Sequence, residues 1–160
     1  KKPLRKLLTL PRLRQLGVPA QVQTSGVMPQ VASVFTRDRA VESMEAGNVV
    51  LFGGGTGNPL FSTDTASALR AIETGCDVMF KATMVDGVYD KDPKKYADAV
   101  KYDQLTFTEV LEKNLAVMDG TAATLCRENK LPILVFDLKD PDNIARAVRG
   151  ETIGTLVVEE

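Results

Sequence analysis

Short hydrophobic runs alternate with segments of helical spacing along this chain of 160 residues. The run Val49–Phe52 is continuously apolar, as in a buried parallel strand. The segment Thr63–Thr74 carries Ala66, Leu69 and Ile72 at the spacing of one helix face. By the same patterns we expect further strands and helices at Ala20–Thr24, Arg37–Ala46, Asp77–Ala82, Thr106 onward, Met118–Lys130, Ile133–Phe136, Asp140–Gly150 and Thr155–Val158.

Capping residues support several of these boundaries. Thr36 has the short hydroxyl side chain of a helix N-cap, and Gly47 suits the C-terminal stop of the same helix. Thr106 and Glu109 have the spacing of a capping box. In the first 16 residues the apolar spacing is also helical, but Pro11 is expected to break a continuous helix there.

The alternation of strands and helices predicts an α/β fold, with a mostly parallel sheet sandwiched by helices. We expect an atypical basic segment over residues 1–16 and one domain over residues 17–160. Ligands of such sheets bind beyond the carboxyl ends of the strands. The loops at residues 53–63 and 82–93 take those places and are the candidate sites.

Composition narrows the classes of function. Hydrophobic residues make up 44% and charged residues 26% of the chain, which is typical of a soluble globular protein. No apolar run approaches the roughly 20 residues of a membrane helix, and the net charge of -1 indicates neither a nucleic-acid nor a membrane partner. The absence of histidine excludes a Ser-His-Asp triad, a Cys-His dyad and a histidine-ligated metal. Cys76 and Cys126 are expected to be buried and reduced, although the sequence leaves one disulfide open.

Charge is distributed unevenly. Residues 1–37 contain seven basic residues and no acid. An organelle transit segment and a basic arm that contacts phosphates are two interpretations, and a solvated start of the chain is the one we favour. The basic residues are Lys1, Lys2, Arg5, Lys6, Arg12, Arg14 and Arg37.

Residues 53–64 combine backbone freedom with polar side chains. Three consecutive glycines let the chain turn sharply and approach a ligand closely. The helix expected next points its first N–H groups back at this loop, an arrangement that suits an anion and most naturally a phosphate. The spacing fits neither a Walker A loop nor a strict GxGxxG fingerprint, and a tight strand-to-helix turn is the alternative. Short polar side chains come from Thr56, Asn58, Ser62 and Thr63.

Asp64 is unexpected beside a phosphate site, because a carboxylate repels the ligand. It makes sense there if it contacts Mg²⁺ or orients lysines that face the phosphates. The alternative is that Asp64 is only a favourable acid in the first turn of a helix.

The second candidate loop, Lys81–Pro93, mixes a lysine at a strand end with turn residues, an aromatic ring and a further carboxylate. Tyr89 would stack on an adenine and Asp92 would accept hydrogen bonds from ribose hydroxyls. The alternative is turn chemistry alone, because Asp-Gly and Asp-Pro are common in turns.

Two motifs carry a resemblance to a known family. The run Gly55–Ala66, Gly-Thr-Gly-Asn-Pro-Leu-Phe-Ser-Thr-Asp-Thr-Ala, resembles the signature of bacterial-type uridylate (UMP) kinases. Lys81–Tyr89, with Asp92-Pro93, is similar to the second motif of those enzymes, and its Asp-Gly-Val-Tyr-x-x-Asp-Pro part is shared across the amino acid kinase superfamily. The resemblance covers about residues 17–158, because shorter elements fall in the family's order at Leu105-Thr106, Met118-Asp119, Lys130–Ile133 and Gly154-Thr155.

The resemblance implies an amino acid kinase-like, nucleotide-binding α/β domain over residues 17–160. It implies transfer of the γ-phosphate of ATP to UMP, which gives UDP in pyrimidine nucleotide biosynthesis, with ATP as co-substrate and Mg²⁺ as cofactor, and it assigns no residue as a metal ligand. Complete family members are hexamers that GTP activates and UTP inhibits. The implied location is the cytoplasm, with an organelle of bacterial descent as the alternative.

The resemblance also assigns roles by motif position. Asp64 would be the carboxylate that organises charge at the transfer site, and Asp119 would help to position the catalytic lysine. Thr83, Tyr89 and Asp92 would bind ATP. The residues that would bind UMP are Thr56, Gly57, Asn58, Pro59, Leu60, Phe61, Ser62 and Thr63.

Complete members carry two further elements ahead of the matched region. One is a Lys-x-Ser-Gly element with the catalytic lysine, and the other is a Gly-Gly-Gly-Asn loop; this sequence contains neither. We therefore expect the fold to be incomplete at its N-terminus. One alternative function is a catalytically weak or inactive nucleotide-binding module that needs a partner or the missing portion. Another is a related kinase acting on a carboxylate or carbamate, against which Thr56–Pro59 counts.

Overall fold

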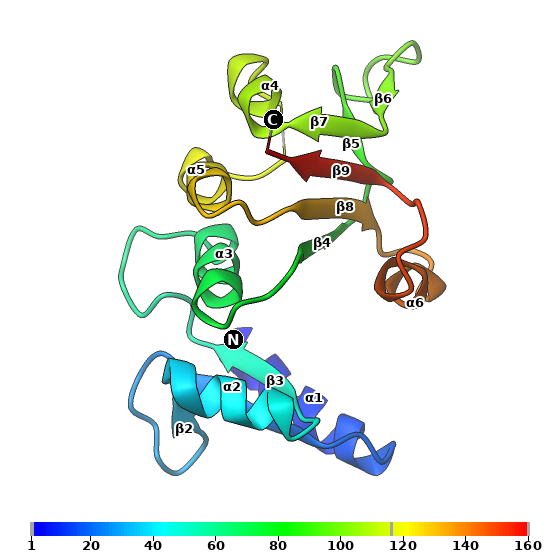
Figure 1. Cartoon of the computed structure of the whole chain (residues 1–160). Coiled ribbons are helices and arrows are strands. Elements are labelled where there is room, and N and C mark those ends of the chain that lie inside the picture. The colour runs from blue at the N-terminus through cyan, green and yellow to red at the C-terminus, as the bar shows by residue number, and fades with distance from the viewer. Residues whose placement is uncertain (1, 116, 160) are drawn as a thin grey trace. The chain divides into compact units, whose positions relative to one another are not determined.

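The computed structural model describes residues 2–115 and 117–159. The chain forms two units that divide after Thr74, and each is described by itself (Figure 1). The expected division after residue 16 stays a prediction. Lys1, one of the basic residues named above, lies outside the described residues.

The first unit is built on a small parallel sheet. Its strands are β1 (Ala20–Thr24), β2 (Ser33–Val34) and β3 (Val49–Gly53), in the order β2-β1-β3. Thr24 pairs with Gly53, so β1 and β3 end side by side. Both strands lie where they were expected, but the expected burial of β3 is wrong. Only Gly53 of this strand is buried, and Val49 is 42% exposed, because β3 is an edge strand of its sheet.

The first helix, α1 (Lys2–Gln15), runs through Pro11 without interruption, so the expected break is wrong. A proline inside a helix removes one backbone N–H and crowds the carbonyl four residues earlier. Here the helix packs against β1 and β3, and the Arg14 guanidinium donates to the Ala20 carbonyl at 3.2 Å. Tertiary contacts of this kind outweigh the local preference of a single residue.

Two further helices of the first unit begin at hydroxyl caps. Thr36 caps α2 (Arg37–Glu45) and Ser62 caps α3 (Thr63–Glu73), each by accepting a hydrogen bond from a backbone N–H of the first turn. Gly47 follows α2 with φ +82°, the left-handed conformation in which helices commonly end. The cap at Thr36, the stop at Gly47 and the start of α3 at Thr63 agree with the sequence, whereas the Ser62 cap was not expected.

A stacked cluster fixes α3 to the strand that precedes it. The guanidinium of Arg70 lies 3.8 Å from the centre of the Phe35 ring, a contact that favours a cation over an aromatic face. Phe35 in turn meets Phe52 of β3 edge to face, with ring centroids 5.5 Å apart. Arg70 also forms an ion pair with Glu73, which compensates the burial of its charge. The loop between β3 and α3 is therefore held at both of its ends.

The second unit holds a mixed four-stranded sheet and a separate hairpin (Figure 1). The sheet consists, in order, of β4 (Met79–Thr83), β8 (Ile133–Asp137), β9 (Thr155–Val158) and β7 (Gln104–Thr106), and all neighbouring pairs are parallel except β8 with β9. The antiparallel hairpin joins β5 (Val88–Tyr89) and β6 (Lys101–Tyr102). With a parallel sheet in the first unit as well, the predicted α/β fold with mostly parallel strands is confirmed.

The helices described in the second unit are α4 (Phe107–Glu112), α5 (Gly120–Glu128) and α6 (Asp142–Val148). The capping box expected at the start of α4 is present, since Thr106 and Glu109 exchange side-chain to backbone bonds of 3.1 and 3.0 Å. A bond from Lys113 and the bond from the Thr106 N–H lower the pKa of Glu109. The core of the unit joins the sheet to α4 and α5 through the buried side chains of Ile133, Val135, Val157, Phe107, Val110, Ala122 and Cys126.

No helix of the described residues has the length and the apolar character that crossing a membrane requires. Both cysteines are outside any disulfide, but the expectation that both are buried is right only for Cys126. Burial raises the pKa of the Cys126 thiol to about 11, because a thiolate is poorly solvated in the core. Cys76 is exposed just beyond α3.

We expect a thiol reagent at mildly alkaline pH to modify Cys76 quickly and Cys126 only after unfolding. Exposure controls the first reaction, and both burial and the raised pKa slow the second. The measurement is the time course of labelling, read by mass spectrometry, with Cys76→Ser as the control that leaves only the slow thiol. Rapid labelling of both residues in the folded chain would contradict the burial of Cys126.

Candidate functional site

The loop between β3 and α3 takes a conformation that depends on glycine. Gly54, Gly55 and Gly57 have φ angles of +85°, +66° and +83°, in the region that residues with a Cβ rarely adopt. Leu60 has φ +71°, which is uncommon for a residue other than glycine. The sharp strand-to-helix turn expected from the sequence is therefore present.

Two hydroxyls that were expected to face a phosphate make bonds to the loop itself and to the first turn of α3. Thr56 Oγ1 accepts from the Asn58 N–H at 3.1 Å and donates to the Asn58 carbonyl at 3.3 Å. Ser62 Oγ accepts from the Thr65 N–H at 3.0 Å and lies 3.2 Å from the Thr65 hydroxyl. Much of the hydrogen-bonding capacity of these side chains shapes the loop, so backbone N–H groups become the more important donors for an anion.

The exposed part of the loop is chemically mixed. Residues 57–63 are all exposed. Among them the Leu60 side chain is fully exposed and Phe61 is 54% exposed. Apolar side chains next to backbone donors suit a ligand that joins a flat apolar ring to an anionic group. A nucleotide has both parts.

Asp64 lies half-buried in the first turn of α3. The N–H groups of a first helical turn favour a carboxylate at this place. Because Arg70 anchors the same helix to Phe35, the backbone of Asp64 keeps a fixed position beside the glycine loop. This placement agrees both with a charge-organising role and with a simple helix-start role, and the substitution described below separates the two.

The chain segment after β1 contributes a residue that the sequence analysis missed. The Ser25 N–H donates to the Gly53 carbonyl at 3.1 Å, and the Ser25 hydroxyl donates to the Gly54 carbonyl at 2.8 Å. Neighbouring parallel strands end at the same edge of their sheet, so the expected topology already pointed to this segment. Ser25 lies outside both sequence motifs, which is why it was overlooked.

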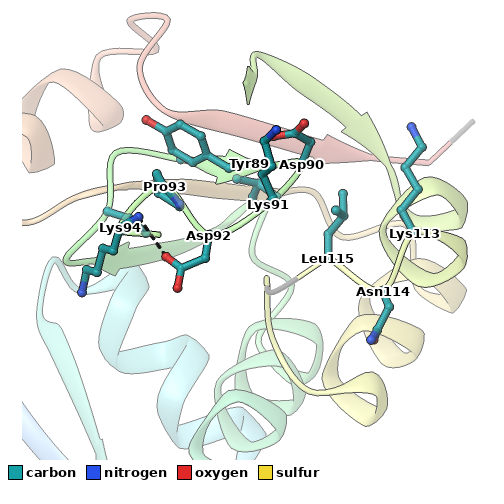
Figure 2. Close-up of a pocket in the computed structure, with 12 residues that line it drawn as sticks. Tyr89, Asp90, Lys91, Asp92, Pro93, Lys94, Lys113, Asn114 and Leu115 are labelled. Atoms are coloured by element: carbon teal, nitrogen blue, oxygen red, sulfur yellow. Dashed lines mark hydrogen bonds between the residues drawn. The ribbon is translucent and has the colours of Figure 1, made fainter. Parts of the chain in front are cut away.

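The second candidate loop borders a pocket of about 450 Å³ within the second unit. Figure 2 shows residues 89–94 along one side of the pocket and residues 113–115 on the other. The Tyr89 hydroxyl donates to Asp86 at 2.8 Å, and this bond to a carboxylate raises the pKa of Tyr89. Asp86 also lies 3.8 Å from the Lys101 ammonium. The orientation of the Tyr89 ring is thus fixed from its polar end, which leaves the ring itself for stacking.

Asp92 lines the same pocket and also forms the turn that contains it. Its Oδ1 accepts from the Lys94 N–H at 3.0 Å, as Figure 2 shows, and its Oδ2 lies 3.8 Å from the Lys95 ammonium. Thr83 pairs with Asp137 in the β4–β8 ladder and is not among the residues that line the pocket. Of the three residues expected at an ATP site, the structure brings Tyr89 and Asp92 together in one pocket, and Thr83 lies outside its lining.

Asp119 is the N-cap of α5 and accepts from the Ala122 N–H at 3.0 Å. Its position is therefore explained by the start of a helix, as that of Asp64 also is in part. Within the described residues, three or more Asp, Glu or Cys side chains nowhere converge in a way that would hold a metal ion.

A buried hydroxyl ties the hairpin of the second candidate loop to the sheet. Thr155 is fully buried; its Oγ1 accepts from the Val88 N–H at 2.8 Å and donates to the Tyr102 carbonyl. A Cβ on Gly87 would lie 2.6 Å from the same oxygen, so the close approach needs glycine. Gly154-Thr155 is one of the short elements of the family resemblance, but its sequence alone indicates no role. The hydroxyl fixes both strands of the hairpin from which Tyr89 comes.

Comparisons with known proteins agree with this geometry. The model of the amino acid kinase family matches residues 10–137. A uridylate kinase of Paramagnetospirillum magneticum is 55% identical over 148 residues, which are 92% of this chain and 62% of that protein. Solved structures of UMP kinases are also similar. The one from Bacillus anthracis is 36% identical with a TM-score of 0.95, over 98% of this chain and 65% of its own. The one from Ureaplasma parvum is 33% identical with a TM-score of 0.92, over 98% of this chain and 67% of its own.

The chain belongs to the amino acid kinase family, since the family model covers most of its length. Within that family it is similar to uridylate kinases, as its two motifs indicate, and this resemblance is confirmed. The chain spans 62% of the length of the curated relative that it matches.

We expect Thr155→Val to lower the free energy of unfolding by about 1–3 kcal/mol, because it leaves buried backbone groups without their hydroxyl partner. Under the ATP role that is proposed below for the Tyr89 pocket, affinity for Mg-ATP should fall as well, since the hairpin that carries Tyr89 loses its anchor. Urea unfolding and calorimetric titration with Mg-ATP measure the two effects. Thr155→Ser is the matched control, because it keeps the hydroxyl and should retain most of the affinity. Equal behaviour of the valine and serine variants would contradict the role of the hydroxyl.

Proposed function

We propose that this chain carries the nucleotide-binding loops of a UMP kinase, which transfers the γ-phosphate of ATP to UMP and gives UDP in pyrimidine nucleotide biosynthesis. The observation that carries the proposal is the glycine-rich run Gly55–Ala66. It folds as a strand–loop–helix turn with left-handed glycines and a capped helix, in a chain that is 55% identical to a uridylate kinase.

In this proposal the loop from Thr56 to Thr63 binds the acceptor, UMP. The acceptor phosphate would accept from the backbone N–H groups of the loop and of the first turn of α3. The exposed apolar side chains Leu60 and Phe61 would lie beside the base. Thr56 and Ser62 would act mainly by holding the loop in shape, because their hydroxyls bond to loop and helix backbone.

The second unit supplies the ATP side in this proposal. The Tyr89 ring would stack on the adenine, with its hydroxyl held by Asp86. Asp92 would accept from ribose hydroxyls at the mouth of the same pocket. Thr83, at the carboxyl end of β4, would contact ATP from outside the pocket lining.

The chemistry of transfer suits a chain without histidine. The nucleophile is a phosphate oxygen of UMP, already largely ionised at neutral pH because its second pKa is about 6. No general base is needed, so catalysis consists of aligning two anions and relieving their repulsion. Asp64 would be a fixed charge that orients cationic groups around the phosphates, and Asp119 would help to place the catalytic lysine.

Mg²⁺ would neutralise phosphate charge during transfer. In nucleotide kinases this ion is held mostly by phosphate oxygens, with one or two protein carboxylates. The half-buried Asp64 carboxylate beside the glycine loop fits that donor set. The remaining parts of the proposal follow the family: a homo-oligomer, hexameric in complete members; GTP and UTP as effectors; and a location in the cytoplasm or in an organelle of bacterial descent.

The test is phosphoryl transfer from Mg-ATP to UMP by the purified chain, with CMP as the control acceptor and calorimetric titration of each nucleotide. We expect both UMP and Mg-ATP to bind, and UDP to form in preference to CDP. Binding without turnover would restrict the proposal to nucleotide recognition. Failure to bind either nucleotide would contradict it.

We also expect Asp64→Asn to reduce single-turnover transfer by about a hundredfold, the size of effect seen when one charge-stabilising group is removed from a transfer site. Nucleotide affinities should change much less. Asp38→Asn is a matched control, since Asp38 is an exposed acid in the first turn of α2 and tests the helix-start effect alone. If the Asp64→Asn variant transfers phosphate at the parental rate, Asp64 has no role in transfer and only stabilises the first turn of α3.

A further inference from the structure

The glycine loop is fastened at one point to the end of the neighbouring strand. The Ser25 hydroxyl donates to the Gly54 carbonyl at 2.8 Å, and the Ser25 N–H donates to the Gly53 carbonyl at 3.1 Å. The Gly57 N–H donates to the same Gly54 carbonyl at 3.3 Å. The Gly54 carbonyl thus accepts from outside the loop and from within it, and its direction is fixed.

The direction of that carbonyl sets the direction of the next N–H group. None of the described peptide bonds is cis, and in a trans peptide the C=O and the N–H point in opposite directions. Because the Gly54 oxygen turns toward Ser25, the Gly55 N–H points away from the end of β1. Backbone N–H groups presented in this way by a glycine-rich turn are donors for a phosphate.

The contact depends on the absence of a side chain at Gly54. A Cβ on this residue would lie 2.4 Å from Ser25 Oγ, so the hydroxyl would have to rotate away and give up its bond. A Cβ on Gly55 would meet nothing within 4 Å, although its φ of +66° is left-handed as well. The two glycines therefore share the left-handed backbone region, which would strain any residue with a Cβ, and differ in their contact with Ser25.

From these contacts we infer that Ser25 is a positioning residue of the acceptor loop: its hydroxyl holds the Gly54 carbonyl so that the Gly55 N–H is presented to the phosphate of the bound nucleoside monophosphate. The identity of that ligand rests on the proposed function. The hydrogen bond from Ser25 to the Gly54 carbonyl and the lack of room for a Cβ on Gly54 do not rest on it, because both are present without a nucleotide.

The experiment compares Ser25→Ala in three backgrounds of the full chain: the parental sequence, Gly54→Ala and Gly55→Ala. Each variant is titrated with UMP and with Mg-ATP by calorimetry, and is unfolded in urea without nucleotide. In the parental background we expect Ser25→Ala to weaken UMP binding about three- to tenfold, the effect of one hydrogen bond, and to leave Mg-ATP binding unchanged.

The two glycine backgrounds separate positioning from general destabilisation. In Gly54→Ala the hydroxyl is already displaced, so Ser25→Ala should cause no further loss of UMP affinity. In Gly55→Ala the hydroxyl bond remains, so Ser25→Ala should cause its full loss. The urea unfolding midpoints should show the same pattern. The effects of Ser25→Ala and Gly54→Ala on the midpoint should not add, whereas those of Ser25→Ala and Gly55→Ala should.

Equal weakening of UMP and Mg-ATP, or additive effects of Ser25→Ala and Gly54→Ala, would overturn the inference. If the parental chain fails to bind UMP, the proposed function falls and the unfolding data decide on the contact itself. Non-additivity at Gly54 would then support the positioning of the loop for another ligand, and additivity would overturn it.

Discussion

Parallel pairing of β1 with β3 is the constraint on which the candidate site of the first unit depends. The register sets Thr24 beside Gly53, so both strands release the chain at the same edge of the sheet. The segment that leaves β1 then meets the glycine loop that leaves β3. At its far end the loop enters α3, which Arg70 fixes to the Phe35–Phe52 pair. A loop held at both ends loses little conformational freedom when a ligand binds, which is the physical basis of preorganisation.

The second unit reaches a similar result by different means. Its hairpin, which carries Tyr89, pairs two short strands, and such a pair is marginal by itself. The buried hydroxyl of Thr155 joins this hairpin to β9, an inner strand of the larger sheet. In both units, side chains inside the motif and side chains outside it hold the loop together. Thr56 and Ser62 act from inside the first motif, whereas Ser25 and Thr155 act from neighbouring strands or their ends.

Local patterns predicted most of the elements, because hydrophobic spacing and capping residues act over a few positions. The caps at Thr36 and Thr106 and the strand at Ala20–Thr24 are examples. The continuous helix through Pro11 and the exposure of β3 depend on tertiary packing and on sheet order, neither of which spacing reveals.

The same limit applies to the candidate site. The loop at residues 53–64 could be recognised from its glycines and from its place after a strand. The hydrogen bonds of the Thr56 and Ser62 hydroxyls to nearby backbone N–H groups could not be predicted from the sequence. The partner of a side-chain hydroxyl depends on which groups the folded loop brings close to it. Ser25 and Thr155 were missed for a related reason, since each contacts residues at least 28 positions away and lies outside the two candidate loops.

The anchor at Thr155 also has a consequence for the order in which the chain folds. Val88 and Thr155 are separated by 67 residues, so the hairpin cannot be fixed until everything between them has been synthesised. Strand β9, which carries Thr155, also lies between β8 and β7 and joins them. Contacts over such separations form late, because closing the intervening chain costs entropy before any contact offsets it. On the ribosome, the glycine loop of the first unit can therefore fold before Thr155, which fixes the hairpin of the second unit, has been synthesised.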